Sequence, residues 1–292
     1  MQYFVNQIIL PFFQFLSNLS IDLFLLLIGF SKLIYLDFDG FLKSYNIIDA
    51  TSTWLFFLIF CFLAVLIFLK LFGAVGLYIY TVIAIISGNI QILKLVKFSF
   101  FNEPVALGTA LFASTFFCTD ILSEYFGKKE AQKNVFLGFA GFLLMTFFMI
   151  FTIGFKPLDP LSVSSTYEWA LKTQENLISI FLPFPTFFIS SMLAYLTSQF
   201  FDVWFFEWIS KLTNKRFLWL RNNLSTMTSS LIDNFIFSIF AWIIFNPNPL
   251  EFNTVLFTFI LGTYILRIII AIIDTPFLYL SRFFLPKNHA RF

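Results

Sequence analysis

Residues 54–70 read WLFFLIFCFLAVLIFLK, an apolar run that is broken only at its end, by Lys70. A helix needs roughly 20 apolar residues to cross the hydrocarbon core of a bilayer, which is about 30 Å thick. Strands of a membrane barrel would be about ten residues long and would alternate in polarity, which this run does not do. The stretch therefore predicts a transmembrane helix.

Similar runs continue to the end of the chain and decide the fold class. They lie near 74–96, 104–126, 134–155, 177–206, 218–245 and 252–281. A further run, about 10–36, is interrupted by Asp22 and Lys32, and we expect it either to span the bilayer or to lie in its interface. The prediction is an all-α, polytopic transmembrane helical bundle with six core helices plus one or two N-terminal extra spans.

Basic residues between the runs orient the bundle, because cytoplasmic loops carry an excess of Lys and Arg. They gather after Phe126, after Phe206 and in the C-terminal tail, which are alternate connections. The prediction is a multi-pass inner-membrane protein with a cytoplasmic C-terminus. The segment 156–176 is then an outside loop, with a short surface helix around 167–172.

We expect three parts along the chain. Residues 1–73 would be an N-terminal extension with one or two membrane helices, 74–285 the six-helix core, and 286–292 a cytoplasmic tail.

The composition excludes several classes of protein. Charged residues make up 12% of the 292 residues, against about 25% in soluble domains, and 59% are hydrophobic. The 18 Lys and Arg residues balance 16 Asp and Glu residues, which leaves no broad basic surface for nucleic acid. Cys61, Cys118 and the single His289 have no metal-type spacing. We therefore expect no metal site, no cofactor and no nucleic-acid partner.

Function in such a bundle is best sought at polar side chains inside the apolar runs. A charge at a helix centre is costly in a bilayer, and such residues usually face the bundle interior. Gln199 and Asp202 are three residues apart and share one helix face, as do Arg221, Ser225, Ser229 and Asp233 at four-residue steps. The candidate substrate-binding residues are Asn89, Asp120, Gln199, Asp202, Arg221, Ser225, Asp233 and Arg267.

These positions also have purely structural interpretations. Glu124 shares a helix face with Asp120 and would only pair with a nearby lysine, while the serine and glutamine faces would form hydrogen-bonded seams between helices. Arg221 would be anchored at the cytoplasmic headgroups. Arg267 needs an acidic partner under either interpretation. The possible partners are Asp274, Asp233 and Asp202.

Motifs of ATPases and of common hydrolases are absent. The chain has no G-x-x-x-x-G-K-[ST], no H-E-x-x-H and no G-x-S-x-G sequence. We expect it not to be an enzyme; the alternative is a membrane enzyme that uses Asp120 and Asp202 as acid and base. Three aromatic residues are candidates for stacking on a planar ligand: Tyr195, Trp204 and Trp219.

Several blocks, taken in order, resemble the queuosine precursor transporter family, also called the vitamin uptake transporter type. The main blocks are Thr119-Asp-Ile-Leu-Ser-Glu-Tyr-Phe-Gly-Lys-Lys-Glu-Ala131, Ser198-Gln-Phe-Phe-Asp-Val203 and Leu218-Trp-Leu-Arg-Asn-Asn-Leu-Ser-Thr226, followed by Ile232-Asp233. The Gly88-Asn89 helix and the closing helix from Arg267 to Tyr279 fit the same order. The resemblance covers about 77–285.

The resemblance implies a six- or seven-helix inner-membrane protein that imports a queuosine precursor for salvage into tRNA. The cargo would be 7-cyano-7-deazaguanine, its aminomethyl relative, or queuine. A carboxylate can accept hydrogen bonds from the N1–H and 2-amino groups of such a base, and Gln199 or Asn89 could satisfy its O6. The sequence departs from the family pattern at Ser229 and Ser230, where Gln or Asn is usual, and at Arg267, where Lys is common.

Two transport mechanisms remain open at this point. A secondary transporter or facilitator would be driven by trapping the base in tRNA or by protons coupled through a carboxylate such as Asp202. The alternative is a substrate-binding membrane subunit of an ATP-energised importer, with ATPase partner chains. The expected partners are the small-molecule 7-deazaguanine and the lipid bilayer, and the sequence leaves open whether the chain forms a homo-oligomer.

Overall fold

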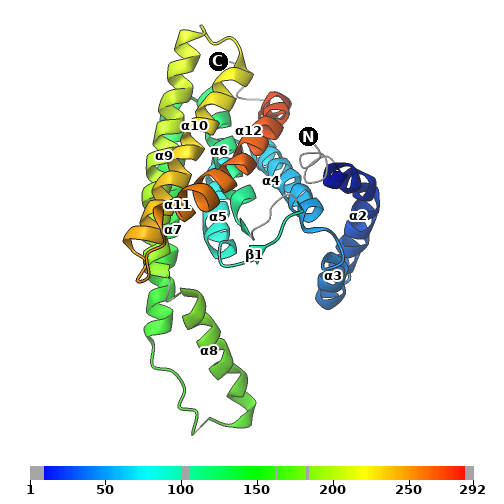
Figure 1. The fold of residues 1–292 in the computed structure, drawn as a ribbon, viewed down its shortest axis with the longest axis vertical. Coiled ribbons are helices and arrows are strands. Elements are labelled where there is room, and N and C mark those ends of the chain that lie inside the picture. The colour runs from blue at the N-terminus through cyan, green and yellow to red at the C-terminus, as the bar shows by residue number, and fades with distance from the viewer. Residues whose placement is uncertain (1–9, 100–104, 162, 182–183, 287–292) are drawn as a thin grey trace.

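The computed structural model describes residues 10–99, 105–161, 163–181 and 184–286, which are almost entirely helical (Figure 1). The N-terminal half contains α2 (Leu10–Ile34), α3 (Phe38–Tyr45), α4 (Ala50–Phe72), α5 (Ala74–Gln91), β1 (Leu95–Val96), β2 (Val105–Ala106), α6 (Thr109–Tyr125) and α7 (Lys128–Gly154). The C-terminal half contains η2 (Ser165–Tyr167), α8 (Glu168–Phe181), α9 (Phe184–Leu212), α10 (Leu218–Ile239), η3 (Phe240–Ile244), α11 (Phe252–Thr254), η4 (Val255–Leu261), α12 (Gly262–Ser281) and η5 (Arg282–Phe284).

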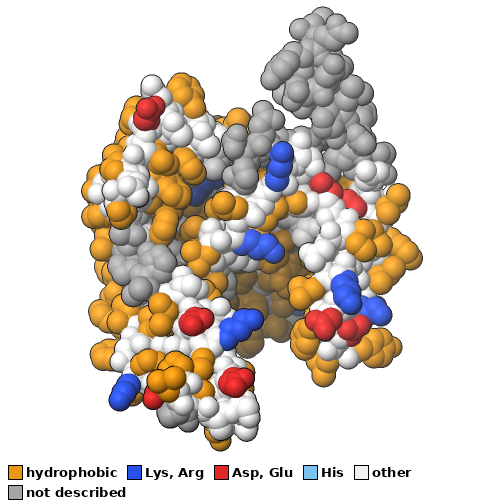
Figure 2. Space-filling view, turned by 60° about the horizontal axis from the view of Figure 1, so that its bottom comes forward, with side chains coloured by type: hydrophobic (Ala, Val, Ile, Leu, Met, Phe, Trp, Pro, Cys, Tyr) orange, Lys and Arg blue, Asp and Glu red, His pale blue; other side chains and the backbone are white. Residues whose placement is uncertain are grey.

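Five stretches among the described residues are long and apolar enough to cross a membrane. They are Ala50–Phe72, Ala74–Gln91, Lys128–Gly154, Leu218–Ile244 and Phe252–Phe284. Figure 2 shows hydrophobic side chains spread over much of one outer face, as expected for a surface in contact with lipid. These findings confirm the prediction of an all-α membrane protein, while the number of crossings stays a prediction.

Helix α6 is the centre of the bundle. It packs against α4, α5, α7, α9 and α12, and most of its residues are buried. Its small residues, such as Ala110, Ala113 and Ser114, let neighbouring helices approach closely, as is typical of helix contacts in membranes. Polar side chains on this helix are therefore held inside the protein.

Two predicted spans are wrong at the ends that face each other. In the described part of the runs 74–96 and 104–126, α5 ends at Gln91 and α6 begins only at Thr109, because β1 and β2 form an antiparallel hairpin that pairs Leu95 with Ala106. Gly108 adopts a φ of 105°, a left-handed conformation that suits glycine, and α6 begins directly after it. Hydropathy cannot separate this apolar hairpin from a helix end, because both are apolar.

The predicted run 177–206 is also divided differently. Its first residues belong to α8, which covers most of the expected surface helix at 167–172 but extends to Phe181, and α9 continues to Leu212. None of the residues of α8 is buried, and Figure 1 shows it extending from the lower end of the bundle. The α9–α10 connection and the end of α12 lie at the opposite end, and the side of the membrane that each end faces stays a prediction.

The N-terminal helices are joined to the core through α4. Leu58, Phe62 and Leu66 of α4 belong to the main hydrophobic core, and the Ser52 hydroxyl donates a 2.5 Å hydrogen bond to the buried Asp22 of α2. The division at residue 73 stays a prediction. Residues 287–292 of the expected tail, which include His289, lie outside the described residues.

Candidate functional site

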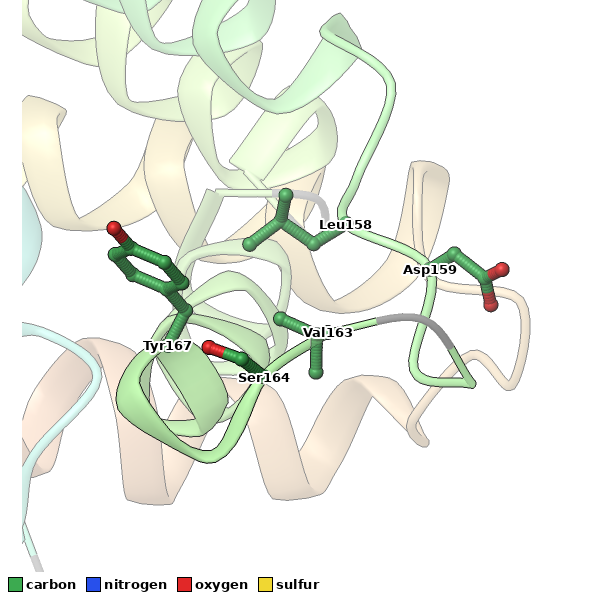
Figure 3. A pocket seen from close by; sticks show the side chains of 5 residues that line it. All are labelled: Leu158, Asp159, Val163, Ser164 and Tyr167. Atoms are coloured by element: carbon green, nitrogen blue, oxygen red, sulfur yellow. The ribbon is translucent and has the colours of Figure 1, made fainter.

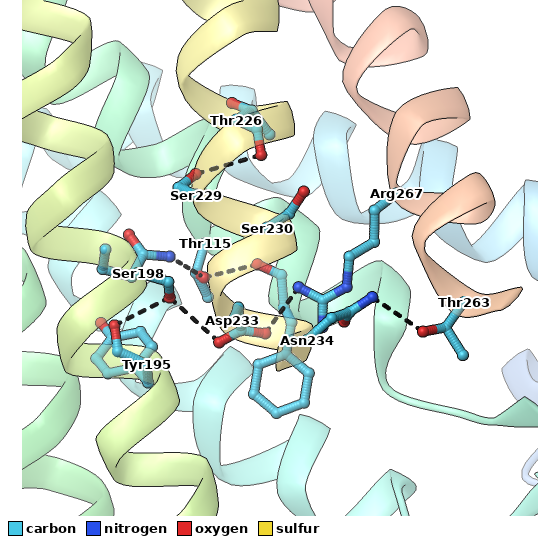
Figure 4. Close-up of polar contacts among 12 residues, drawn as sticks. Thr115, Tyr195, Ser198, Thr226, Ser229, Ser230, Asp233, Asn234, Thr263 and Arg267 are labelled. Atoms are coloured by element: carbon cyan, nitrogen blue, oxygen red, sulfur yellow. Dashed lines mark hydrogen bonds and ion pairs between the residues drawn. The ribbon is translucent and has the colours of Figure 1, made fainter. Parts of the chain in front are cut away.

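Polar side chains from α6, α9, α10 and α12 meet inside the apolar bundle (Figure 4). They recur every three or four residues, so each helix turns one polar face inward. We call this set the polar seam. Its members are Thr115, Thr119, Asp120, Ser198, Gln199, Asp202, Thr226, Ser229, Asp233 and Arg267.

An ion pair between Asp233 and Arg267 lies at one end of the seam. Arg267 Nη1 is 2.7 Å from Asp233 Oδ2, and the Ser198 hydroxyl donates to Asp233 Oδ1 at 3.1 Å. The two charged side chains are 15% and 14% exposed. Of the three possible acidic partners for Arg267, the structure therefore selects Asp233. Arg267 Nε has no acceptor among the described residues.

Asn234 fixes the helix that carries Arg267. Its amide donates to the carbonyl of Ile260 at 3.2 Å and to the hydroxyl of Thr263 at 2.9 Å. Ile260 lies in the π-helical stretch η4, where the wider turns leave carbonyl groups to be satisfied by side chains. This contact locks α12 to α10 one turn away from the ion pair.

Asp120 and Asp202 are completely buried in the middle of the seam. The Ser229 hydroxyl donates to Asp202 Oδ1 at 2.8 Å, and the Thr226 hydroxyl donates to Asp120 Oδ2 at 3.2 Å. Neither carboxyl group has an Arg or Lys partner within ion-pair distance among the described residues. Ser229, where the sequence departs from the family pattern, is therefore in direct contact with a candidate site residue.

Gln199 has both ends of its amide satisfied by protein groups. Its Nε2 donates to Thr115 at 2.9 Å, and its Oε1 accepts from Thr119 at 3.1 Å. All three side chains are buried. In this conformation Gln199 therefore joins α9 to α6.

Arg221 and Ser225 lie further along the same face of α10. The Arg221 guanidinium is 1% exposed and forms an ion pair with Glu124, so it is held inside the bundle rather than exposed to headgroups. It also donates to the carbonyl of Arg216 and lies 5.4 Å from the ring centre of Phe206. Ser225 donates to the backbone of its own helix.

Asn89 stands apart from the seam. Its amide donates to the Ile85 carbonyl at 2.8 Å and accepts from Ser191 at 2.7 Å, which links α5 to α9. Of the three aromatic candidates, Tyr195 is buried, whereas about half of the surface of Trp204 and of Trp219 is exposed. The two tryptophans therefore lie on the outside of the bundle.

A small cavity borders Arg267. It contains about 240 Å³ of empty space, of which about 10 Å³ can be reached by the centre of a water molecule. That is room for roughly one water, so the seam is closed to a base in this conformation. The lining residues are Thr109, Ala113, Phe116, Thr226, Ser230, Arg267 and Ile270. A larger hollow, in which about 310 Å³ can be reached by the centre of a water molecule, lies in the loop before α8, at Leu158, Asp159, Val163, Ser164 and Tyr167 (Figure 3).

Several partners within the seam were not among the residues predicted from the sequence. Thr115 and Thr119 are four residues apart and share a face, a signal that could have marked them. Asn134 near the start of α7 is fully buried with neither amide atom partnered among the described residues, and no pattern around it pointed to this. No group of three His, Cys, Asp or Glu side chains in the described part of the chain is placed to hold a metal ion.

Comparisons with known proteins identify the family. Residues 106–281 match the family described as "Putative vitamin uptake transporter". A protein of Bacillus subtilis (strain 168), named "Probable queuosine precursor transporter", is 34% identical over 238 residues, which are 81% of this chain and 96% of that protein. No solved structure matches the chain. The matched region contains α6, α9, α10 and α12, which carry the polar seam, and the chain belongs to the vitamin uptake transporter family that includes queuosine precursor transporters.

Proposed function

We propose that this chain imports a 7-deazaguanine precursor of queuosine across the inner membrane, with its C-terminus in the cytoplasm. The observation that carries the proposal is the match to the Bacillus subtilis relative, which extends over 96% of that protein. The polar seam gives the match a chemical basis, because it provides charged groups inside a bundle whose surroundings are apolar. The imported base would then be salvaged into tRNA.

The Asp233–Arg267 pair has the chemistry to read the edge of such a base. A 7-deazaguanine presents two donors, N1–H and the 2-amino group, next to one acceptor, O6. A carboxylate accepts both donors, while a guanidinium donates to the acceptor. Arg267 borders the cavity, and its Nε still lacks an acceptor among the described residues. We propose that the ion pair opens to admit the base between α10 and α12.

The remaining candidates would shape this site. Gln199, Arg221, Ser225 and Asn89 already have protein partners, so we propose that they hold the helices around the base. The cavity must widen before a base can enter, because ligand pockets usually measure about 300–1,000 Å³. The closed seam therefore corresponds to a conformation between the outward-open and inward-open states of alternating access.

Competition binding with purified protein tests this proposal. Labelled 7-cyano-7-deazaguanine should be displaced by its aminomethyl relative and by queuine. Adenine, which presents the opposite arrangement of donor and acceptor, should compete at least about 30-fold more weakly, because two hydrogen bonds of about 1–3 kcal/mol each would be left unmade. The proposal is contradicted if none of the 7-deazaguanines binds or if adenine competes equally.

A further inference from the structure

The core of the bundle contains more acidic side chains than its basic side chains can neutralise. Arg267 is paired with Asp233 and Arg221 is paired with Glu124. Three other carboxyl groups have no exposed surface and no cationic partner among the described residues. They are Asp120, Asp202 and Asp274. Burying an ionised carboxylate without a partner costs several kcal/mol of folding free energy. Something other than an arginine or a lysine must therefore offset the negative charge of these groups.

Helix α10 holds Asp120 and Asp202 at neighbouring positions along one face. The Thr226 hydroxyl donates to Asp120 at 3.2 Å, and the Ser229 hydroxyl, three residues further along that face, donates to Asp202 at 2.8 Å. Ionised carboxylates only accept hydrogen bonds, so neither group can donate to the other unless one of them carries a proton. Each group also keeps one fully buried oxygen, Oδ1 of Asp120 and Oδ2 of Asp202, that receives no hydrogen bond from any described donor. Two missing donors at buried carboxyl groups that are held one helical turn apart indicate a missing proton.

The surroundings offer no other way to balance two negative charges. Among the described residues, three other titratable groups interact with Asp120. They are Asp274 on α12 and, on the same helix α6 as Asp120, Glu124 and Cys118. Glu124 is neutralised by Arg221 of α10, and Asp274 accepts a 2.7 Å hydrogen bond from the Asn222 amide. Cys118 in turn interacts with Cys61 of α4 and with Tyr80 of α5, and neither of these groups carries a positive charge.

We propose that Asp120 and Asp202 share a single proton and form the proton-binding site that couples uptake of the base to proton entry. This role rests on the proposed function. One proton joins the doubly ionised pair from outside and is shared in the closed conformation. It leaves to the cytoplasm when opening admits water, so one proton is bound and one is released in each cycle. The separate Asp233–Arg267 pair, two turns along α10 from the contact with Thr226, remains available to the base.

Infrared spectroscopy of the purified protein at pH 7 tests the shared proton without any substrate. The spectrum of the wild type minus that of Asp120→Asn/Asp202→Asn should contain one carboxylic-acid band and one carboxylate band. The matched control Asp233→Asn should remove a carboxylate band alone, because Asp233 is paired with Arg267. A difference spectrum with two carboxylate bands, or with two carboxylic-acid bands, overturns the proposal.

Wild-type protein in lightly buffered vesicles tests the coupling and needs no variant to fold. Uptake of 7-cyano-7-deazaguanine should make the external medium alkaline, with about one proton taken up per base, and an imposed inward proton gradient should raise accumulation at least tenfold. Uptake with no proton movement overturns the coupling. If none of the three bases enters the vesicles at any pH, the proposed function fails instead, and the infrared result still decides whether the pair holds a proton.

Discussion

Replacing Arg267 by methionine should reduce uptake of the base to background. The change leaves Asp233 as a buried carboxylate without its partner 2.7 Å away and removes the donor proposed for O6 of the base. The charge-assisted hydrogen bond to O6 is worth about 1.5–3 kcal/mol, so its loss alone corresponds to about a 10- to 150-fold loss of affinity for the base, and the unpaired Asp233 adds to that loss. Initial uptake rates of labelled 7-cyano-7-deazaguanine, divided by the amount of protein in the membrane, measure the effect.

Two further variants separate this loss from a general effect of losing an arginine. Arg282 is exposed at the end of the same helical segment, so Arg282→Met should transport at nearly the wild-type rate. Arg267→Lys keeps the charge but loses the planar fork of donors, so it should transport at an intermediate rate. Wild-type uptake by Arg267→Met would remove the Asp233–Arg267 pair from the site.

The second large effect is expected on stability, at the ion pair between α6 and α10. Arg221→Met removes a guanidinium that is 1% exposed and leaves Glu124 facing the bundle without its partner. We expect the protein in detergent to lose about 3 kcal/mol of stability, the lower end for a broken buried pair, because Glu124 is still 23% exposed. Denaturant or thermal unfolding followed by tryptophan fluorescence measures the change.

A double variant and a surface control complete this test. Arg221→Met/Glu124→Gln should recover most of the lost stability, because no unpaired charge is then left inside. Lys211→Met breaks a pair with Glu207 whose lysine is 74% exposed, and it should change stability by less than about 1 kcal/mol. If Arg221→Met and Lys211→Met lose the same amount of stability, the burial of the Arg221–Glu124 pair does not contribute to the stability of the protein.

The membrane helices were predictable because a bilayer demands long apolar runs. The ends of these helices were harder to predict, since hydropathy measures only the apolar part of a helix. Helix α7, expected to begin near residue 134, begins at Lys128, because its charged first turns are also helical. The hairpin of β1 and β2 depends on pairing across a loop, which no local pattern in 74–126 reveals.

The sequence predicted that several polar side chains would face the inside of the bundle, but it did not predict how they pair. Helical spacing showed that Asp202, Asp233 and Arg267 would turn inward, because polar residues on one face of a membrane helix avoid lipid. It did not show that Arg267 would choose Asp233 over Asp202 or Asp274. That choice depends on how α12 crosses α10, which is set by packing contacts such as Asn234 with Thr263.

Restoration of queuosine in tRNA tests the central claim most directly. The chain would be expressed in a bacterial strain that can neither make nor import the precursor, and 7-cyano-7-deazaguanine would be supplied in the medium. We expect queuosine to return to tRNA with the wild type and to stay absent with Arg267→Met at equal protein levels. If queuosine stays absent with the wild type when each of the three precursors is supplied in turn, the chain does not carry this cargo.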